Sequence, residues 1–371
     1  MLIPRYQSVH AQRAENWLGA DLYQALLDFD HYAPVSVFGF DAPVIAEHHD
    51  LLGPTRVGQY CSYAEHLGEQ ARRWLKRLRR AMRHQDLVLP AGFSSLSDLM
   101  SEATVNGKQQ FTNFTKAGTT GVAGVMNSLA RVGPFPAGQA TAAAFAAGES
   151  PTKTTPAGLG LPFDNAAGGD TLHLLSGVFV ANVSSQLLLM YDRYYQGNWN
   201  VATSSQAVSG TPTRYQSTEA KGTFCSMEVS TALGATGGQA FTLTYVDQDG
   251  NTAEAGPNGL TIVASSIVNR FPFATPDWKA RLNAGDWGVR AITNLGLSAA
   301  TATGNVNVFL GKPIGLVPIP PSANQPIGIS YVNSMFGMSK IVDDACVCIM
   351  EKWKSSTTAT NYTGDIIIGS G

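Results

Sequence analysis

The sequence changes character after about residue 108. Before this point the chain is charged and helix-patterned; after it comes a long stretch rich in Gly, Ala, Ser and Thr, followed by repeated strand and turn signals. Six of the seven histidines precede the change, so the β-rich remainder has only His173 for proton chemistry near neutral pH. A large domain nearly lacking histidine is a poor candidate for acid and base catalysis, and the pattern is more typical of an assembly component.

The composition supports the same interpretation. A chain of 371 residues is long enough for two or three domains. Charged residues make up 14% of it, well below the usual quarter. Low charge suits surfaces that other subunits will cover, because an unpaired charge is costly to desolvate at an interface. The net charge of −2 disfavours nucleic acid as a partner of the whole chain.

The sequence also predicts no membrane-spanning segment, and we expect no membrane as a partner of the whole chain. No stretch approaches eighteen uninterrupted apolar residues, and the first residues, Met1 to Arg5, lack the apolar segment of a secretory signal. We therefore expect synthesis and initial folding in a cytoplasm.

The clearest predicted helix runs from Tyr63 to about His84, where apolar residues recur with a 3.6-residue period. Its other face carries seven basic residues and no acid among them, namely Arg72, Arg73, Lys76, Arg77, Arg79, Arg80 and Arg83. These charges repel one another unless they are screened or neutralised. Three alternatives stay open for this face: a solvated surface, docking on an acidic partner, or contact with nucleic acid or membrane.

Three regions are predicted along the chain: a helical anchoring region over 1–108, a small-residue arm over 109–170, and a β-sandwich over 171–371. Large apolar residues recur in the arm as anchors, which a purely flexible linker would omit: Phe114, Met126, Leu129, Phe135, Phe145 and Phe163.

The third region reads as short strands joined by Gly, Pro and Asn turns. The predicted strands are 172–180, 186–191, 225–229, 241–245, 260–264, 289–297, 306–310, 327–332, 341–350 and 365–368. Their number and spacing predict a mainly β protein, an antiparallel β-sandwich of the jelly-roll or immunoglobulin-like kind, behind a helical N-terminal region.

The search for catalytic and metal-binding motifs is negative. No nucleophile elbow, phosphate loop, zinc-protease motif or dinucleotide fingerprint occurs. The four cysteines, Cys61, Cys225, Cys346 and Cys348, lack metal-site spacing and are interpreted as buried thiols. The His- and acid-rich stretch 47–66 is interpreted as a solvated loop, and 247–251 as a hairpin turn rather than a calcium loop. We therefore expect no metal, no cofactor and no enzymatic activity.

One aromatic cluster offers a binding hypothesis. Tyr194, Tyr195 and Trp199 would stack on sugar rings if they were exposed, and would be core residues otherwise. A carboxylate pair for glycoside hydrolysis is not indicated at any particular place, since the separation of such a pair is a three-dimensional property.

Three phrases in the β-rich region carry a resemblance to a known group of proteins. They are 213–215, 241–250 and Leu282-Asn283-Ala284-Gly285-Asp286-Trp287-Gly288-Val289-Arg290, followed by Gly304 to Leu310 and then Lys312-Pro313. In content and order they resemble β-sandwich regions of tailed-bacteriophage virion proteins, over roughly residues 170–320.

The resemblance implies a capsid- or tail-associated structural protein without enzymatic activity. Because the long spine helix of the usual tailed-phage shell fold is missing from the middle of the chain, it favours a capsid decoration or cement subunit. The implied partners are copies of the chain and other virion proteins, above all the major capsid protein, and the implied location is the virion, after synthesis in the host cytoplasm. The alternatives are a tail, collar or fibre component that binds a host receptor or glycan, and a polysaccharide hydrolase.

Overall fold

The computed structural model describes residues 98–99, 101–139, 141–145, 147–182, 186–257, 260–274, 276–319, 323–332, 339–353 and 360–371. All of them belong to one compact unit of the chain, Leu89–Gly371. The predicted helical region and its basic helix therefore lie outside the described residues, apart from a short π-helical turn, η2 (Ser101–Val105).

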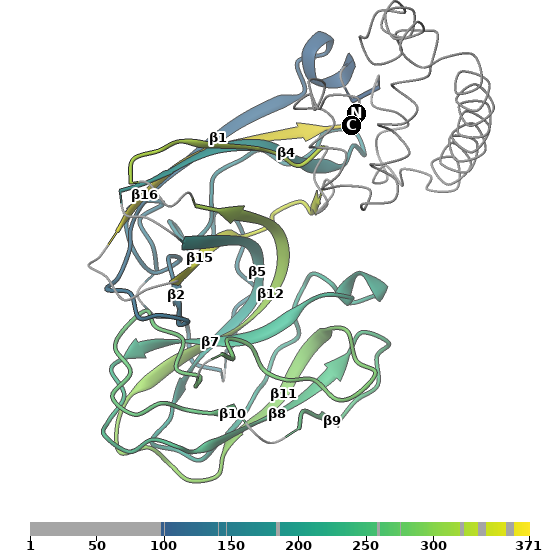
Figure 1. The fold of residues 1–371 in the computed structure, drawn as a ribbon. Helices are drawn as coiled ribbons and strands as arrows, with labels where there is room; N and C mark the ends of the chain where they lie inside the picture. Colours follow the sequence, from purple (N-terminus) through teal and green to yellow (C-terminus); the bar gives the residue numbers. More distant parts are fainter. Residues whose placement is uncertain are drawn as a thin grey trace, which may run out of the picture. The chain divides into compact units, whose positions relative to one another are not determined.

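Three antiparallel sheets make up the described unit (Figure 1). The first, called the outer sheet, has the strand order β13-β4-β16-β1-β3, with β14 also paired to β4. Its strands are β1 (Gln109–Ala117), β3 (Pro134–Phe135), β4 (Leu172–Ala181), β13 (Ile327–Ser330), β14 (Lys340–Ile341) and β16 (Asn361–Ser370).

The second, the central sheet, has the order β2-β15-β5-β12-β7. Its strands are β2 (Met126–Ser128), β5 (Gln186–Asn200), β7 (Phe224–Thr231), β12 (Asn305–Pro318) and β15 (Val347–Trp353). The third sheet has the order β10-β8-β11-β6, with β9 paired to β8. Its strands are β6 (Ser205–Ala207), β8 (Ala240–Asp247), β9 (Glu254–Ala255), β10 (Leu260–Thr261) and β11 (Val289–Leu297). A 3-10 turn, η3 (Thr218–Ala220), precedes β7.

The long strands β5 and β12 curve strongly, and the pair packs against both of the other sheets (Figure 1). One end of this pair packs against the outer sheet through Met190 and Val317, and the other end packs against the third sheet through Trp199 and Val308. Both sets of side chains share one face of the central sheet. The opposite face holds a third apolar cluster, which includes Phe309. The central sheet is therefore buried on both faces, as the nearly unbroken burial of β12 indicates.

The mainly β prediction is confirmed, and β11 has the predicted bounds. The strands β5 and β12 are longer than predicted, because polar residues interrupt their apolar runs without ending them. Asp192 and Arg193 lie inside β5, where each forms an ion pair. The register of β5 with β12 shifts between Leu310 and Gly311, an irregularity of the kind that bends strands.

The segment 109–170 contributes β1, β2 and β3 to sheets that also contain strands from the region after 170. Of its predicted anchors, Phe114 and Phe145 are almost fully buried, and so are Met126 and Leu129. Phe135 is 44% exposed, which corrects its assignment as an anchor.

Candidate assembly surface

The outer sheet has one buried face and one exposed face. Because side chains alternate along a strand, Phe114, Phe179 and Ile366 point into the core while their neighbours point outward. On β1, β3, β4, β13 and β16 the outward residues include Phe111, Asn113, Thr115, Ala117, Phe135, Ser176, Val178, Val180, Gly328, Ser330, Asn361, Thr363, Asp365 and Ile367. Lys340, the exposed residue of β14, lies outside this set. We call this set the neutral face.

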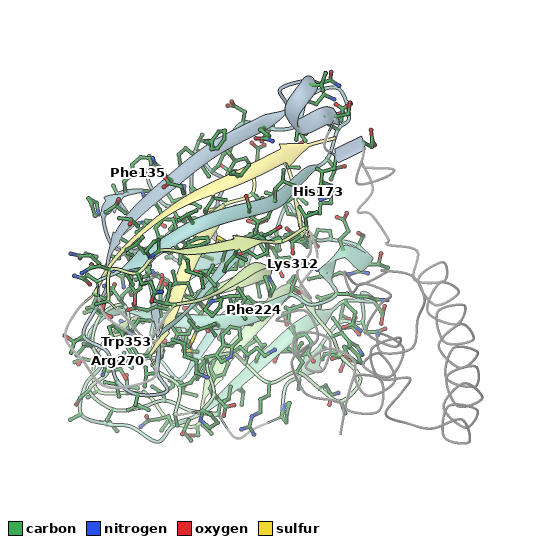
Figure 2. The ribbon with its side chains drawn as sticks, turned by 45° about the horizontal axis from the view of Figure 1, so that its top comes forward. Phe135, His173, Phe224, Arg270, Lys312 and Trp353 are labelled. Atoms are coloured by element: carbon green, nitrogen blue, oxygen red, sulfur yellow. The ribbon has the colours of Figure 1, made fainter. Side chains whose placement is uncertain are left out.

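Strand register arranges the neutral face in rows. Phe111 lies opposite Ile367, and Val178 lies opposite Asp365, so apolar side chains from three strands are brought close together. Phe111 is 75% exposed and Val178 is 47% exposed. At one end Leu99, which precedes η2, packs with Leu175 and Ile367 and covers part of the sheet. Figure 2 shows the outer sheet broadly, with β1 in blue and β16 in yellow, and Phe135 at one end of it.

The neutral face carries a single charged side chain, Asp365. A solvated protein surface usually has charged residues at about 25–35% of its positions. An uncharged, partly apolar sheet face binds water weakly, so the desolvation cost is small when a partner covers it. The arrangement is therefore suited to burial against another protein surface.

The predicted partner-docking residues, Arg72, Arg73, Lys76, Arg77, Arg79, Arg80 and Arg83, lie outside the described residues. The stretch 47–66 and Cys61 lie outside them as well.

Of the two alternatives for Tyr194, Tyr195 and Trp199, the structure shows core residues, since all three are at most 1% exposed. They belong to the apolar cluster between the central and third sheets. Their polar atoms find partners inside the protein: the Tyr195 hydroxyl donates to the Ser209 carbonyl over 2.6 Å, and the Trp199 indole N–H donates to Thr203 Oγ1 over 3.2 Å. Buried aromatic rings with bonded polar tips stabilise a core, and none of these three is accessible to a sugar.

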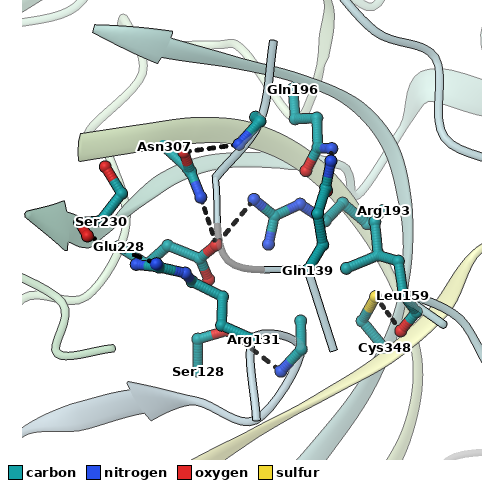
Figure 3. Close-up of polar contacts among 12 residues, drawn as sticks. Ser128, Arg131, Gln139, Leu159, Arg193, Gln196, Glu228, Ser230, Asn307 and Cys348 are labelled. Atoms are coloured by element: carbon teal, nitrogen blue, oxygen red, sulfur yellow. Dashed lines mark hydrogen bonds and ion pairs between the residues drawn. The ribbon is translucent and has the colours of Figure 1, made fainter. Parts of the chain in front are cut away.

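A buried charge network lies on the face of the central sheet opposite those rings. Arg193 and Glu228 are both fully buried and form an ion pair of 2.9 Å (Figure 3). The amide of Asn307 donates to the same Glu228 oxygen over 3.1 Å, and the guanidinium of Arg193 lies 4.3 Å from the centre of the Phe309 ring. Arg131, from the loop after β2, donates to the carbonyls of Val229 and Ser230.

Burial alone would raise the pKa of Glu228, but the charge of Arg193 and its hydrogen bond outweigh that effect and hold the pKa below its ordinary value. Glu228 is therefore an ionised, paired and inaccessible group. A catalytic acid would need a raised pKa and a path to substrate. This network can fix the packing of the loops over the central sheet, and it offers no exposed nucleophile or base.

Another buried carboxylate lies on the central sheet. Glu351 on β15 is fully buried and accepts a hydrogen bond from the amide of Asn127 over 3.1 Å. Burial raises its pKa, although the hydrogen bond from Asn127 acts in the opposite direction. Nearby, burial lowers the pKa of Lys116 to about 8, and its ammonium group donates to the carbonyls of Val132 and Pro136.

The loop 247–251 is a turn, as predicted. Asp247 Oδ1 accepts the backbone N–H groups of Asp249, Gly250 and Asn251 over 2.7–2.9 Å, and its Oδ2 accepts the side-chain amide of Asn251. These donors occupy the oxygens that a calcium ion would need.

The cysteines of the described region follow the prediction. Cys225, Cys346 and Cys348 are buried free thiols, and the sulfur atoms of Cys346 and Cys348 lie 3.8 Å apart on one side of β15. Within the described ranges, no three His, Cys, Asp or Glu residues are grouped closely enough to hold a metal ion. No helix in the described part of the chain has the length and apolar character needed to cross a membrane.

Sequence reasoning missed the neutral face. Its strongest members, Phe111 and Val178, sit in apolar strand patterns that mark a strand without saying which side is covered. A usable signal was present, since 109–115 contains no charged residue at all.

Comparison with known proteins gives little. No family model matches the sequence, and no curated protein matches it. Among solved structures, the chain is similar to VP2 of infectious bursal disease virus in a subviral particle, with 9% identity, a TM-score of 0.16, and coverage of 73% of this chain and 85% of that one. The VP2 structure from the T13 viral particle of the same virus gives 8% identity and a TM-score of 0.16, over 70% of this chain and 77% of that one. Likenesses at this level carry no argument about this chain.

Proposed function

We propose that the chain is a virion structural protein that assembles with copies of itself, and that the neutral face of the outer sheet is buried in the assembly. The observation that carries the proposal is a sheet face with several exposed apolar side chains and one charge, Asp365. Such a face repels neither a copy of itself nor another uncharged surface. The assignment to a virus particle rests on the resemblance of the phrases between 213 and 313 to virion proteins.

Within this class we propose the role of a capsid decoration or cement subunit, located in the virion and bound to the major capsid protein. A subunit of this kind binds the assembled lattice and stabilises it by mass action. Absence of enzymatic activity is part of the proposal. It is supported by the burial and pairing of Asp192, Arg193 and Glu228, which leaves these groups out of reach of any substrate.

The experiment is quantitative mass spectrometry of purified virus particles from the source, giving copies of this chain per copy of the major shell protein. A ratio near one, or a simple fraction such as one third, is the expected result for a subunit that covers the shell. A handful of copies per particle would contradict the decoration role and favour a collar or fibre. Complete absence from particles would overturn the virion assignment.

The rival of a glycan-binding fibre component loses its predicted residues, because Tyr194, Tyr195 and Trp199 are buried. A polysaccharide hydrolase would release reducing sugars from host polysaccharide, and this assay on the purified full chain checks that rival.

A further inference from the structure

The strand β1 forms an edge of the outer sheet over most of its length. On one side it pairs with β16 from Gln109 to Ala117. On the other side, β3 pairs with it at Thr115 and Lys116. Within the part of the chain that the structure describes, no strand pairs with the segment 109–114 on that second side. Figure 2 shows β1, in blue, as the outermost strand of the sheet next to β16.

The direction of the free main-chain groups follows from two hydrogen bonds. The Ser370 N–H donates to the carbonyl of Lys108 over 3.0 Å, so even-numbered residues direct their main chain toward β16. The Ala117 N–H donates to the Gly133 carbonyl over 2.7 Å on the opposite side. By alternation, Gln109, Phe111 and Asn113 direct their N–H and C=O groups away from β16.

This edge lacks the usual protection against pairing with another chain. Exposed edge strands in monomeric proteins normally carry a charged residue, a proline or a bulge. The segment Gln109-Gln110-Phe111-Thr112-Asn113 has no charge and no proline, and its register with β16 is regular. An unprotected edge is expected where the assembled state covers it.

We infer that β1 pairs with β1 of a second copy of this chain, antiparallel, with a two-fold axis beside Phe111. In this register Phe111 lies opposite Phe111 of the second copy, and Gln109 lies opposite Asn113 of the second copy. The N–H and C=O groups that 109–113 direct away from β16 then form about six hydrogen bonds between the two strands.

A second copy of the chain matches both the length and the lack of charge of the free segment of β1. The free segment ends at Gly107, where the chain turns with φ +66°, and at Thr115, where β3 begins to pair. A partner strand of the same length fills this interval, and no two charges meet across the axis. Phe111 and Asn113 belong to the neutral face, so the pairing joins the neutral faces of two subunits into one surface. The inference deepens the proposed function, because it rests on assembly with copies.

Disulfide trapping in the assembled full chain tests the register. Across a hydrogen-bonded antiparallel pair the Cα atoms lie about 5.5 Å apart, within the span of a disulfide. A Phe111→Cys variant should therefore form covalent dimers under mild oxidation. Asn113→Cys is the matched control on the same strand and face. It should link at least tenfold more slowly alone, and link readily when mixed with Gln109→Cys. The wild-type chain shows the background from native thiols.

A second measurement does not depend on trapping. Amide hydrogen exchange of Phe111 and Asn113 should be fast in the dissociated chain and slow in the assembly. Equal protection in both states would mean that another part of the same chain covers the edge, and it would overturn the inference. Phe111→Cys linking no faster than Asn113→Cys would also overturn it.

These failures are separable from failure of the proposed function, which is read from a Val178→Lys variant. Val178 lies on β4, away from the edge, and belongs to the neutral face. Loss of assembly in Val178→Lys without trapping at Phe111 refutes the edge pairing and supports the neutral face. Trapping at Phe111 with unchanged assembly of Val178→Lys supports the edge pairing and refutes the neutral face.

Discussion

Two sheet faces of the described unit differ in where they carry charge. The face of the central sheet opposite Tyr194, Tyr195 and Trp199 holds a fully buried ion pair, Arg193 with Glu228, together with the amide of Asn307. The neutral face, drawn from β1, β3, β4, β13 and β16 of the outer sheet, holds one charge, Asp365. A monomer in water gains nothing from placing paired charges inside and uncharged apolar groups outside. The inner network can fix how the loops pack, and the contrast supports our proposal that a partner covers the outer face.

The largest expected effect is loss of the buried pair. Replacing Glu228 by Ala leaves the Arg193 guanidinium buried without its carboxylate, which costs about 3–5 kcal/mol of unfolding free energy. Urea unfolding of the purified chain measures it. The double variant Arg193→Met, Glu228→Leu is the matched control, and it should recover most of the loss because no buried charge is left alone. If the single variant unfolded like the wild type, the inner network would have no structural role.

The next effect tests whether the segment 109–170 is part of the same core. Phe145 is 1% exposed, and its ring fills the space beside Gly197 on β5. Truncation of Phe145 to Ala should cost about 3–5 kcal/mol, as for other buried aromatic residues. Phe135→Ala is the control from the same segment, and because that ring is 44% exposed it should change stability by about 0.5 kcal/mol or less. Similar unfolding midpoints for the two variants would show that the segment is a detachable arm.

A smaller effect is expected from Glu351, whose pKa is raised by burial. The folded state then holds the proton more tightly than the unfolded state, so the contribution of this group to stability is full at acid pH and is lost as the pH rises through its folded pKa. A Glu351→Gln variant lacks this dependence. Its stability relative to the wild type should therefore improve from pH 4 to pH 7, measured by urea unfolding at each pH. A constant difference across that range would contradict the raised pKa.

The sequence was informative where a strand has one clear pattern. Val289–Leu297 was predicted with its full bounds, and the alternation in 225–229 places Cys225, Met227 and Val229 in one apolar cluster while Glu228 points the opposite way. The lengths of β5 and β12 were missed, because a charged residue such as Arg193 ends an apolar run in sequence but not in a structure that pairs it.

The candidate surface was harder to predict, as β1 illustrates. Phe111 and Phe114 are three residues apart, so in a strand they must point to opposite sides. The sequence cannot say which ring is inside; the structure buries Phe114 and exposes Phe111. The aromatic cluster was left open for the same reason, since exposure of Tyr194, Tyr195 and Trp199 depends on which sheet covers them.

Self-association of the full chain measures whether the neutral face is a contact between copies. Sedimentation velocity over a range of concentrations would compare the wild type with Val178→Lys and Val263→Lys. The two valines are 47% and 44% exposed, and Val263 lies outside the neutral face, in the segment after β10. The two variants therefore make the same substitution at similar exposure and differ only in where it lies. We expect Val178→Lys to weaken self-association at least tenfold and Val263→Lys to leave it unchanged. Equal self-association of the wild type and both variants would contradict this expectation.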